Sequence, residues 1–225
     1  MAAFIIACAS SKGGCGKTTL AVAIAGVYAS NGSSVLLVDA DSRKRLQEEW
    51  YNPETLSPKI TVISSRVEDV ERDVSKSRDV FDVIIIDVEG SANWALAQAL
   101  QVAHFSLVPS NVSFQDLKDA QKVYDYVESI NKESKRYRHC WIVWNRVPPA
   151  IRSKEMKATM DEAVASGLPI LTTITERDAY KAMFSYQTTL DKLREGQAVP
   201  SAAKAEQEIA ILISAMHEKL ESQAA

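Results

Sequence analysis

The sequence predicts an α/β fold, a doubly wound and mostly parallel sheet flanked by helices. Short apolar segments of strand length alternate with segments of helical periodicity along the 225 residues. Most of the apolar segments are almost continuously apolar, which is typical of parallel strands buried on both faces. A glycine-rich turn follows the first of them and leads into an alanine-rich helical segment. Ligands bind at the carboxyl ends of the strands in such sheets, so we expect the functional site there.

The elements follow one another in a regular order. Residues 4–9 predict the first strand, and residues 18–30 predict the helix that follows the glycine-rich turn. Six more strands are expected at residues 35–41, 59–64, 81–88, 104–110, 139–147 and 168–174. Helices are expected at 91–103 and 114–130, after the Pro-Pro pair at 148–149, and at 204–221. The polar face of the last helix carries mainly glutamates, which favours packing on the domain over binding to a membrane surface.

Composition and charge restrict the class of protein. The length suits one domain spanning residues 1–225, since no linker or repeat divides it. The net charge of −3 gives no overall bias toward nucleic acid or acidic membranes. Three cysteines without a C-x-x-C pair indicate a reducing cytoplasm, and the histidines lack zinc-site spacing. With no signal peptide and no apolar run of about 20 residues, we expect a cytoplasmic protein with no membrane partner.

The stretch SSKGGCGKTTL, residues 10–20, has the features of a phosphate-binding loop. Glycines at 13, 14 and 16 allow a tight turn whose backbone N–H groups point inward, and the helix N-terminus adds partial positive charge. Lys17 matches the lysine that reaches the phosphates, and Thr18 matches the hydroxyl that binds Mg²⁺. The usual first glycine is replaced by Ser11. The motif leaves a second lysine, Lys12, without an assigned role.

Three aspartates stand at the ends of predicted strands. Asp39 and Asp41 end the second strand, and side chains two residues apart in a strand share a face. Asp87 ends the apolar run IIIDV, as a Walker B aspartate does when a buried strand holds it near Mg²⁺. Each acid alone could simply cap the next helix. Their combination with a phosphate loop favours a metal-dependent nucleotide site.

The pattern resembles the ParA/MinD ATPases, which have the fold of P-loop NTPases. KGGCGKTT matches their deviant Walker A motif, and the D-x-D and strand-end aspartates fall where that family has them. The resemblance implies ATP with Mg²⁺ as cofactors and a homodimer formed with ATP. It also implies that Lys12 reaches the phosphates bound by the partner subunit, where it would act as an arginine finger does.

The resemblance also implies roles for individual residues. Lys12 and Lys17 would be catalytic, with Asp41 orienting the attacking water. Mg²⁺ would lie near Thr18, Asp39 and Asp87. The residues expected against the nucleotide are Gly13, Gly14, Cys15, Gly16, Lys17, Thr18, Thr19 and, beside adenine, Asn145. A guanine-reading N-K-x-D following a strand is absent, which favours ATP over GTP.

The C-terminal third contains RVPP at 146–149, then a predicted helix, then LPILTTITERDAYKAM at 168–183. This pattern resembles small ParA proteins of plasmid partition and their DNA-transfer relatives. Residues 132–157 contain eight basic and two acidic residues, a net charge of +6 in a chain of −3. Charge alone fits a solvated face equally well, but the resemblance favours sequence-independent DNA contacts. The candidates are Arg146, Arg152, Lys154, Arg177 and Lys204. The resemblance implies a nucleoid-associated protein that positions a plasmid or other cargo with a ParB-like or cargo-adaptor partner.

Other functions remain open from the sequence. A metabolic ligase similar to dethiobiotin synthetase would use the same loop, but it would need neither Lys12 nor the basic segment. A MinD-like membrane regulator is disfavoured by the acidic last helix. An iron–sulfur relative would need paired cysteines, which this sequence does not contain. Two positions depart from the family pattern or stand out in it. Glu89 replaces a small residue or proline after Asp87, and Cys15, expected at the loop tip, could be a reactive thiol.

Overall fold

Seven strands form one parallel sheet in the order β3-β2-β4-β1-β5-β6-β7. The computed structural model describes residues 2–90, 94–150 and 153–224. The strands are β1 (Phe4–Cys8), β2 (Val35–Ala40), β3 (Ile60–Ser64), β4 (Val83–Val88), β5 (Phe105–Ser110), β6 (His139–Val147) and β7 (Ile170–Thr175). All seven coincide with predicted strands to within one or two residues, so the predicted fold class is confirmed.

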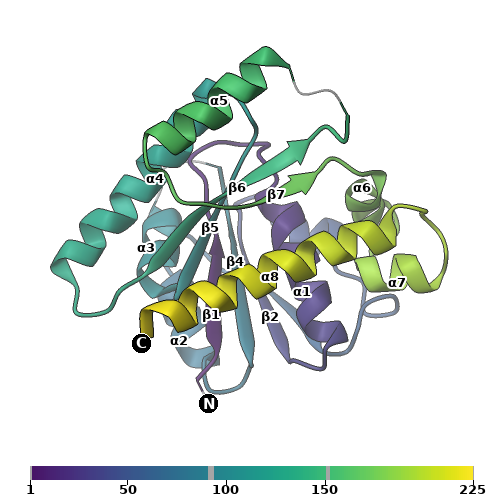
Figure 1. Cartoon of the computed structure of the whole chain (residues 1–225). Coiled ribbons are helices and arrows are strands. Elements are labelled where there is room, and N and C mark those ends of the chain that lie inside the picture. The colour runs from purple at the N-terminus through teal and green to yellow at the C-terminus, as the bar shows by residue number, and fades with distance from the viewer. Residues whose placement is uncertain (1, 91–93, 151–152, 225) are drawn as a thin grey trace.

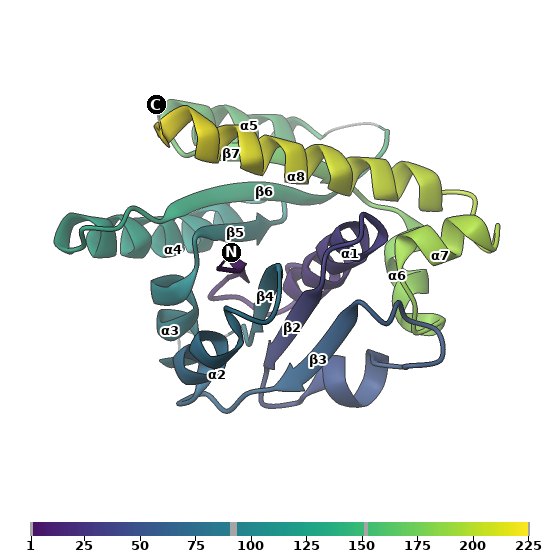
Figure 2. The same ribbon diagram turned by 90° about the horizontal axis from the view of Figure 1, so that it is seen from below.

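Helices cover both faces of the sheet (Figures 1 and 2). Their bounds are α1 (Lys17–Ser30), α2 (Val70–Ser77), α3 (Trp94–Val102), α4 (Phe114–Glu133), α5 (Lys154–Ala165), α6 (Asp178–Ser185), α7 (Leu190–Glu195) and α8 (Ala202–Ala224). A π-helical turn, η1, spans Leu46–Trp50. Helices α1, α3, α4, α5 and α8 were predicted from the sequence, whereas η1, α2, α6 and α7 were not. The first three residues of the helix expected at 91–103 lie outside the described residues.

Two apolar clusters form the core, one on each face of the sheet. Helices α1, α6, α7 and α8 contribute to one cluster, and α2, α3, α4 and α5 contribute to the other. Figure 2 shows α2, α3 and α4 on one side and α1, α6 and α7 on the opposite side. The last helix buries Ile209, Leu212 and Met216 completely, so the prediction that it packs on the domain is confirmed. Within the described chain, no helix is long and apolar enough to cross a membrane.

The register of the parallel strands brings distant residues to one edge. Asp87 of β4 is level with Asp39 of β2 on one side and with Cys8 of β1 on the other. The loops that follow these three strands therefore emerge beside one another. Strands β2, β3 and β4 lie on one side of β1, and β5, β6 and β7 lie on the other. Sheets of this kind bind ligands in a crevice at the strand where the order reverses, which here is β1.

Candidate nucleotide-binding site

The glycine-rich turn joins β1 to α1 and is braced by a residue from β6. Gly16 has a φ of +100°, a backbone conformation that L side chains rarely adopt. A Cβ at Gly16 would overlap the side-chain amide of Asn145. That amide donates a hydrogen bond of 2.7 Å to the carbonyl oxygen of Cys15. Asn145 thus holds the loop in shape. This role was not predicted from the sequence, where the family resemblance linked the residue only to adenine.

Two side chains of the loop turn back onto its backbone. The ammonium of Lys17, in a side chain that is only 6% exposed, donates to the carbonyl oxygen of Lys12 at 2.7 Å. The Cys15 sulfur lies 3.5 Å from the same oxygen and 3.9 Å from the Lys17 nitrogen. Cys15 is buried, so the expectation that it stands at the loop tip is wrong. Its thiol packs against the backbone of the loop and the Lys17 side chain.

Asp87 has an unsatisfied carboxylate oxygen at the end of β4. The residue is almost completely buried, and its Oδ1 atom finds no hydrogen-bond partner among the described residues. Burial raises the pKa of Asp87 to about 7, and a hydrogen bond with Thr18 partly offsets that rise. A carboxylate with a free oxygen beside a hydroxyl is a donor set that suits Mg²⁺.

The described residues contain no group of three or more carboxylate, histidine or cysteine ligands that could hold a metal alone. Mg²⁺ characteristically binds through one or two protein groups together with substrate phosphates. The Thr18 and Asp87 pair fits that mode, in which the remaining ligands come from a nucleotide and from water.

Asp39 and Asp41 have different surroundings although they are two residues apart. Both oxygens of the fully buried Asp39 accept backbone N–H groups, from Asp41 at 3.2 Å and from Leu46 and Gln47 at 2.9 and 3.2 Å. Asp39 therefore fixes the start of η1 and the loop after β2. Asp41 is half-buried and lines a cavity above the glycine loop, with Oδ1 accepting the Arg43 N–H at 2.9 Å. In this structure Asp39 positions the loop, and Asp41 is the aspartate that faces the site.

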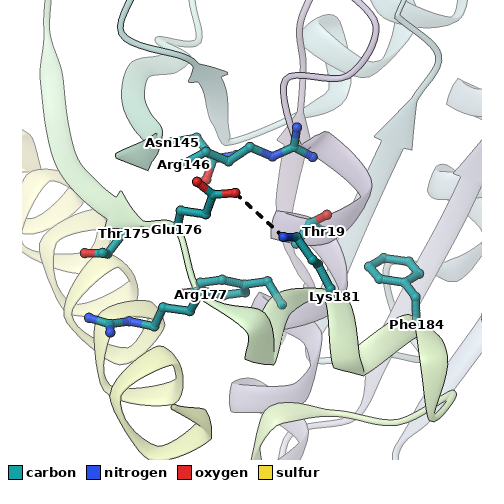
Figure 3. Close-up of a pocket in the computed structure, with 9 residues that line it drawn as sticks. Thr19, Asn145, Arg146, Thr175, Glu176, Arg177, Lys181 and Phe184 are labelled. Atoms are coloured by element: carbon teal, nitrogen blue, oxygen red, sulfur yellow. Dashed lines mark ion pairs between the residues drawn. The ribbon is translucent and has the colours of Figure 1, made fainter. Parts of the chain in front are cut away.

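Two adjoining cavities provide room for a ligand. One, of about 480 Å³, lies over the glycine loop and is bordered by Lys17, Thr18, Asp41 and Glu89. The other, of about 400 Å³, lies between the ends of β6 and β7 and helix α6, and Figure 3 shows the side chains that line it. Both volumes fall within the range of ligand sites in proteins. Thr19, Arg146 and Phe184 border both cavities.

The loop after β4 lies directly on the glycine loop. A Cβ placed on Gly90 would come within 2.6 Å of the Gly13 backbone nitrogen, so only glycine permits this approach. Glu89, the departure from the family pattern, lines the phosphate-side cavity. The backbones of the glycine loop and of the loop after β4 are therefore in close contact. A ligand that displaced one loop would also displace the other.

Lys12 lines neither cavity. Its ammonium forms an ion pair with Asp116 in the first turn of α4. The family resemblance implied a role for Lys12 in another subunit, and no periodicity or motif in the sequence linked it to Asp116, 104 positions away.

The basic segment 132–157 does not form a single surface. Four of its basic residues precede β6, whereas Arg146 lies near the end of this strand and Lys154 and Lys157 follow it. The nine residues of the strand span about 30 Å. In the first half, Arg136 and Arg138 donate to backbone carbonyls at the end of α3, those of Val102, Ala103 and Gln101. These two arginines are structural, which removes them from a count of free positive charges.

The five candidate DNA contacts have different surroundings. Lys154 and Lys204 are exposed at the starts of α5 and α8, and both helix starts lie toward the arrowheads of β6 and β7 in Figure 1. Arg177 is held by Glu208 of α8 through two hydrogen bonds of 3.1 and 2.7 Å. Arg146 borders the ligand cavities, and Arg152 lies outside the described residues.

The fold and the glycine loop together define a P-loop nucleotide-binding protein. The chain belongs to the CobQ/CobB/MinD/ParA nucleotide-binding family, whose sequence model matches residues 6–190. Members of the ParA/MinD group of this family are P-loop ATPases.

Known relatives share most of their length with this chain. Protein ParA of Rhizobium radiobacter is 30% identical over 202 residues, covering 88% of this chain and 90% of the relative. Maintenance of carboxysome distribution protein A of Halothiobacillus neapolitanus is 28% identical over 180 residues, covering 79% and 81%. The solved ATP complex of a Cyanothece McdA variant matches 96% of this chain and 97% of its own, with a TM-score of 0.76 and 18% identity. The similarity to this solved structure, at 18% identity, shows a shared fold.

Proposed function

We propose that this chain is a ParA-type ATPase that dimerises with ATP, binds DNA without sequence preference and positions a plasmid or other large cargo. A partner protein of the ParB or cargo-adaptor kind would stimulate hydrolysis. The observation that carries the proposal is the glycine loop with two lysines, Lys12 and Lys17, over which lies a cavity bordered by Lys17 and adjoined by a second cavity. The similarity to ParA and to the carboxysome distribution protein supports the cargo-positioning role.

The chemistry follows from where charge develops. The backbone N–H groups of the glycine loop and the Lys17 ammonium would hold the β- and γ-phosphates, and the adjoining cavity beside Asn145 would take the base. Mg²⁺ bound near Thr18 and Asp87 would neutralise phosphate charge. Asp41 would orient the attacking water in the cavity, and Lys12 of the second subunit would bring a positive charge to the transferred phosphoryl group.

Lys12→Ala tests the dimer. We expect ATP affinity to stay within about threefold of the wild type, because Lys12 lines neither cavity of its own subunit. Dimerisation with a nonhydrolysable ATP analogue should weaken by about tenfold or more, since the loss of a charge-assisted contact costs at least about 1.5 kcal/mol. Light scattering measures the fraction of dimer. Lys122→Ala, which removes an exposed lysine of α4, is the control, and equal dimers for both variants would reject the proposed role.

DNA binding is tested by the salt dependence of affinity. Lys154, Lys157 and Lys204 are exposed and are clear of the two cavities, so their replacement by alanine spares the nucleotide site. Each lost phosphate contact should reduce the slope of log K against log salt by about 0.9 on duplex DNA. Binding should be stronger with ATP than with ADP because a dimer doubles the contacts.

The matched control for DNA binding is the double variant Lys132→Ala and Lys135→Ala. These exposed lysines precede β6 and lie at the other end of the sheet. Anisotropy titrations on random duplexes should show an unchanged slope for this variant. No binding at low salt, or equal affinity with ATP and ADP, would remove DNA from the proposed function.

A further inference from the structure

A bulge near the end of β6 turns two successive side chains to the same side of the sheet. Side chains in a regular strand alternate between the two faces. Val143 packs in the core cluster on the α1 side of the sheet, and Trp144 packs in the cluster on the opposite side. Val147 packs on the same side as Trp144, although regular alternation would place it on the α1 side. The pairing of β6 with β7 shifts register between Trp144 and Val147, so this part of β6 holds one extra residue.

The bulge redirects the side chain of Arg146. Alternation would point Asn145 and Arg146 to opposite faces, yet both border the cavity between β6, β7 and α6. Arg146 has a φ of +52°, in the left-handed region that glycine adopts readily and other residues adopt rarely. Bulges are frequent beside functional sites, where they re-aim a side chain. An arginine thus faces the ligand side of the sheet at a position whose backbone conformation favours glycine.

The guanidinium of Arg146 lies between the two cavities. Arg146 borders both of them, and in Figure 3 its side chain extends away from Glu176 toward the start of α1. Arg177 lines one of these cavities but is paired with Glu208. Lys181, which lines the same cavity, lies 3.8 Å from a carboxylate oxygen of Glu176. No acceptor among the described residues binds the Arg146 guanidinium, so its N–H donors are available to an anionic ligand.

We propose that Arg146 binds the α-phosphate, the one next to the ribose, of a nucleotide that spans the two cavities. The inference rests on the proposed function, which places the base beside Asn145 and the β- and γ-phosphates over the glycine loop. The ribose and the α-phosphate join these two parts of a nucleotide, and Arg146 lies where the two cavities adjoin. ADP and ATP share this phosphate, so Arg146 stabilises the binding of both. In this role Arg146 contacts the nucleotide and not DNA, for which its place in the basic segment made it a candidate.

The test compares Arg146→Gly with Gln197→Gly. Glycine suits a left-handed backbone, so Arg146→Gly removes the guanidinium without straining the strand. Gln197 has a φ of +50°, is exposed and lies apart from the residues that border the cavities, so it controls for the added glycine. Titration with fluorescent ADP and with a nonhydrolysable fluorescent ATP analogue should show dissociation constants raised about tenfold or more, by a similar factor for both, in Arg146→Gly. Gln197→Gly should change them by less than about twofold.

Two further measurements separate this role from a structural one. Arg146→Lys keeps the positive charge but loses the planar fork, so it should recover part of the affinity that Arg146→Gly loses. Both glycine variants should melt within about 4 °C of the wild type, since the relief of the left-handed backbone offsets the extra freedom of the unfolded chain.

Three results would overturn the inference. The first is unchanged nucleotide affinity in Arg146→Gly. The second is a loss confined to the ATP analogue, which would place the guanidinium at the γ-phosphate. The third is unchanged nucleotide affinity together with a slope of log K against log salt reduced by about 0.9 on duplex DNA, which would make Arg146 a DNA contact.

The two proposals fail in different ways. If the wild type binds neither ADP nor ATP, the proposed function fails. If the wild type binds both and Arg146→Gly binds them equally well, the inference about Arg146 alone fails.

Discussion

Gly16→Ala is expected to abolish measurable nucleotide binding, with a dissociation constant at least about 100-fold higher than that of the wild type. The left-handed backbone at this position, φ +100°, costs an L-residue about 1–2 kcal/mol. The added Cβ would also overlap the Asn145 amide, which would displace the side chain that braces the loop through Cys15. A shift of about 1 Å in the N–H groups of the loop would leave them badly placed to donate hydrogen bonds to a phosphate. Titration with a fluorescent ATP analogue measures the loss.

Gly32→Ala is the matched control for Gly16→Ala. Gly32 has a similar φ of +92°, but a Cβ there meets no atom within 4 Å and the residue lies at the far end of α1. Gly32→Ala should lower the free energy of unfolding by about 1 kcal/mol and leave ATP affinity unchanged. The double variant Gly16→Ala and Asn145→Ala should regain part of the binding, because the overlap is relieved. Wild-type affinity in Gly16→Ala itself would show that the loop does not depend on this contact.

The strands were predictable because parallel strands buried on both faces need apolar residues at nearly every position. Residues 83–88 are buried without exception, and the sequence VIIIDV shows this directly. The missed elements are short and depend on distant packing. Trp50, at the end of η1, is fully buried, and its indole N–H donates to the carbonyls of Met183 and Thr188 at 3.1 and 3.3 Å. Nothing within residues 46–50 indicates those partners.

The site was predictable where the topology fixes it. Parallel strands end at one edge, so acids at strand ends and a glycine loop must meet there, and Asp39 and Asp87 do lie level with each other. Contacts between distant side chains were not predictable. The Lys12–Asp116 pair and the Asn145–Cys15 hydrogen bond join residues 104 and 130 positions apart. No pattern within either segment encodes such a pairing.

The basic segment shows why charge along a chain differs from charge on a surface. Counting from 132 to 157 gave +6, but strand β6 passes through the middle of this segment and carries its two halves to opposite ends of the sheet. Two of its arginines also bind backbone carbonyls of α3. The DNA proposal accordingly depends on the exposed lysines of α5 and α8 and not on the whole segment.

The two aspartates of the D-x-D sequence are expected to separate stability from catalysis. Asp39→Ala would leave the N–H groups of Asp41, Leu46 and Gln47 without their acceptor, that of Leu46 in a buried place and the other two in partly buried places. Unsatisfied buried donors cost about 1–3 kcal/mol each, so this variant should unfold at markedly lower denaturant concentration. Denaturant titration followed by tryptophan fluorescence reports it, since Trp50 ends the turn that Asp39 holds.

Asp41→Ala is expected to lower the rate of ATP hydrolysis by about 100-fold or more while ATP affinity and stability remain close to those of the wild type. Its carboxylate is half-buried at the cavity and, within the part of the chain that the structure describes, accepts one hydrogen bond, from the Arg43 N–H, which water can replace. Loss of a group that orients or deprotonates water typically costs 10²–10⁴ in rate, about 100-fold at the least. Single-turnover hydrolysis, run beside a binding titration, separates the two effects. A collapse of ATP affinity in Asp41→Ala would instead make Asp41 a ligand of the metal or the phosphates, and the orientation of the attacking water would have to come from another residue of this cavity, such as Glu89.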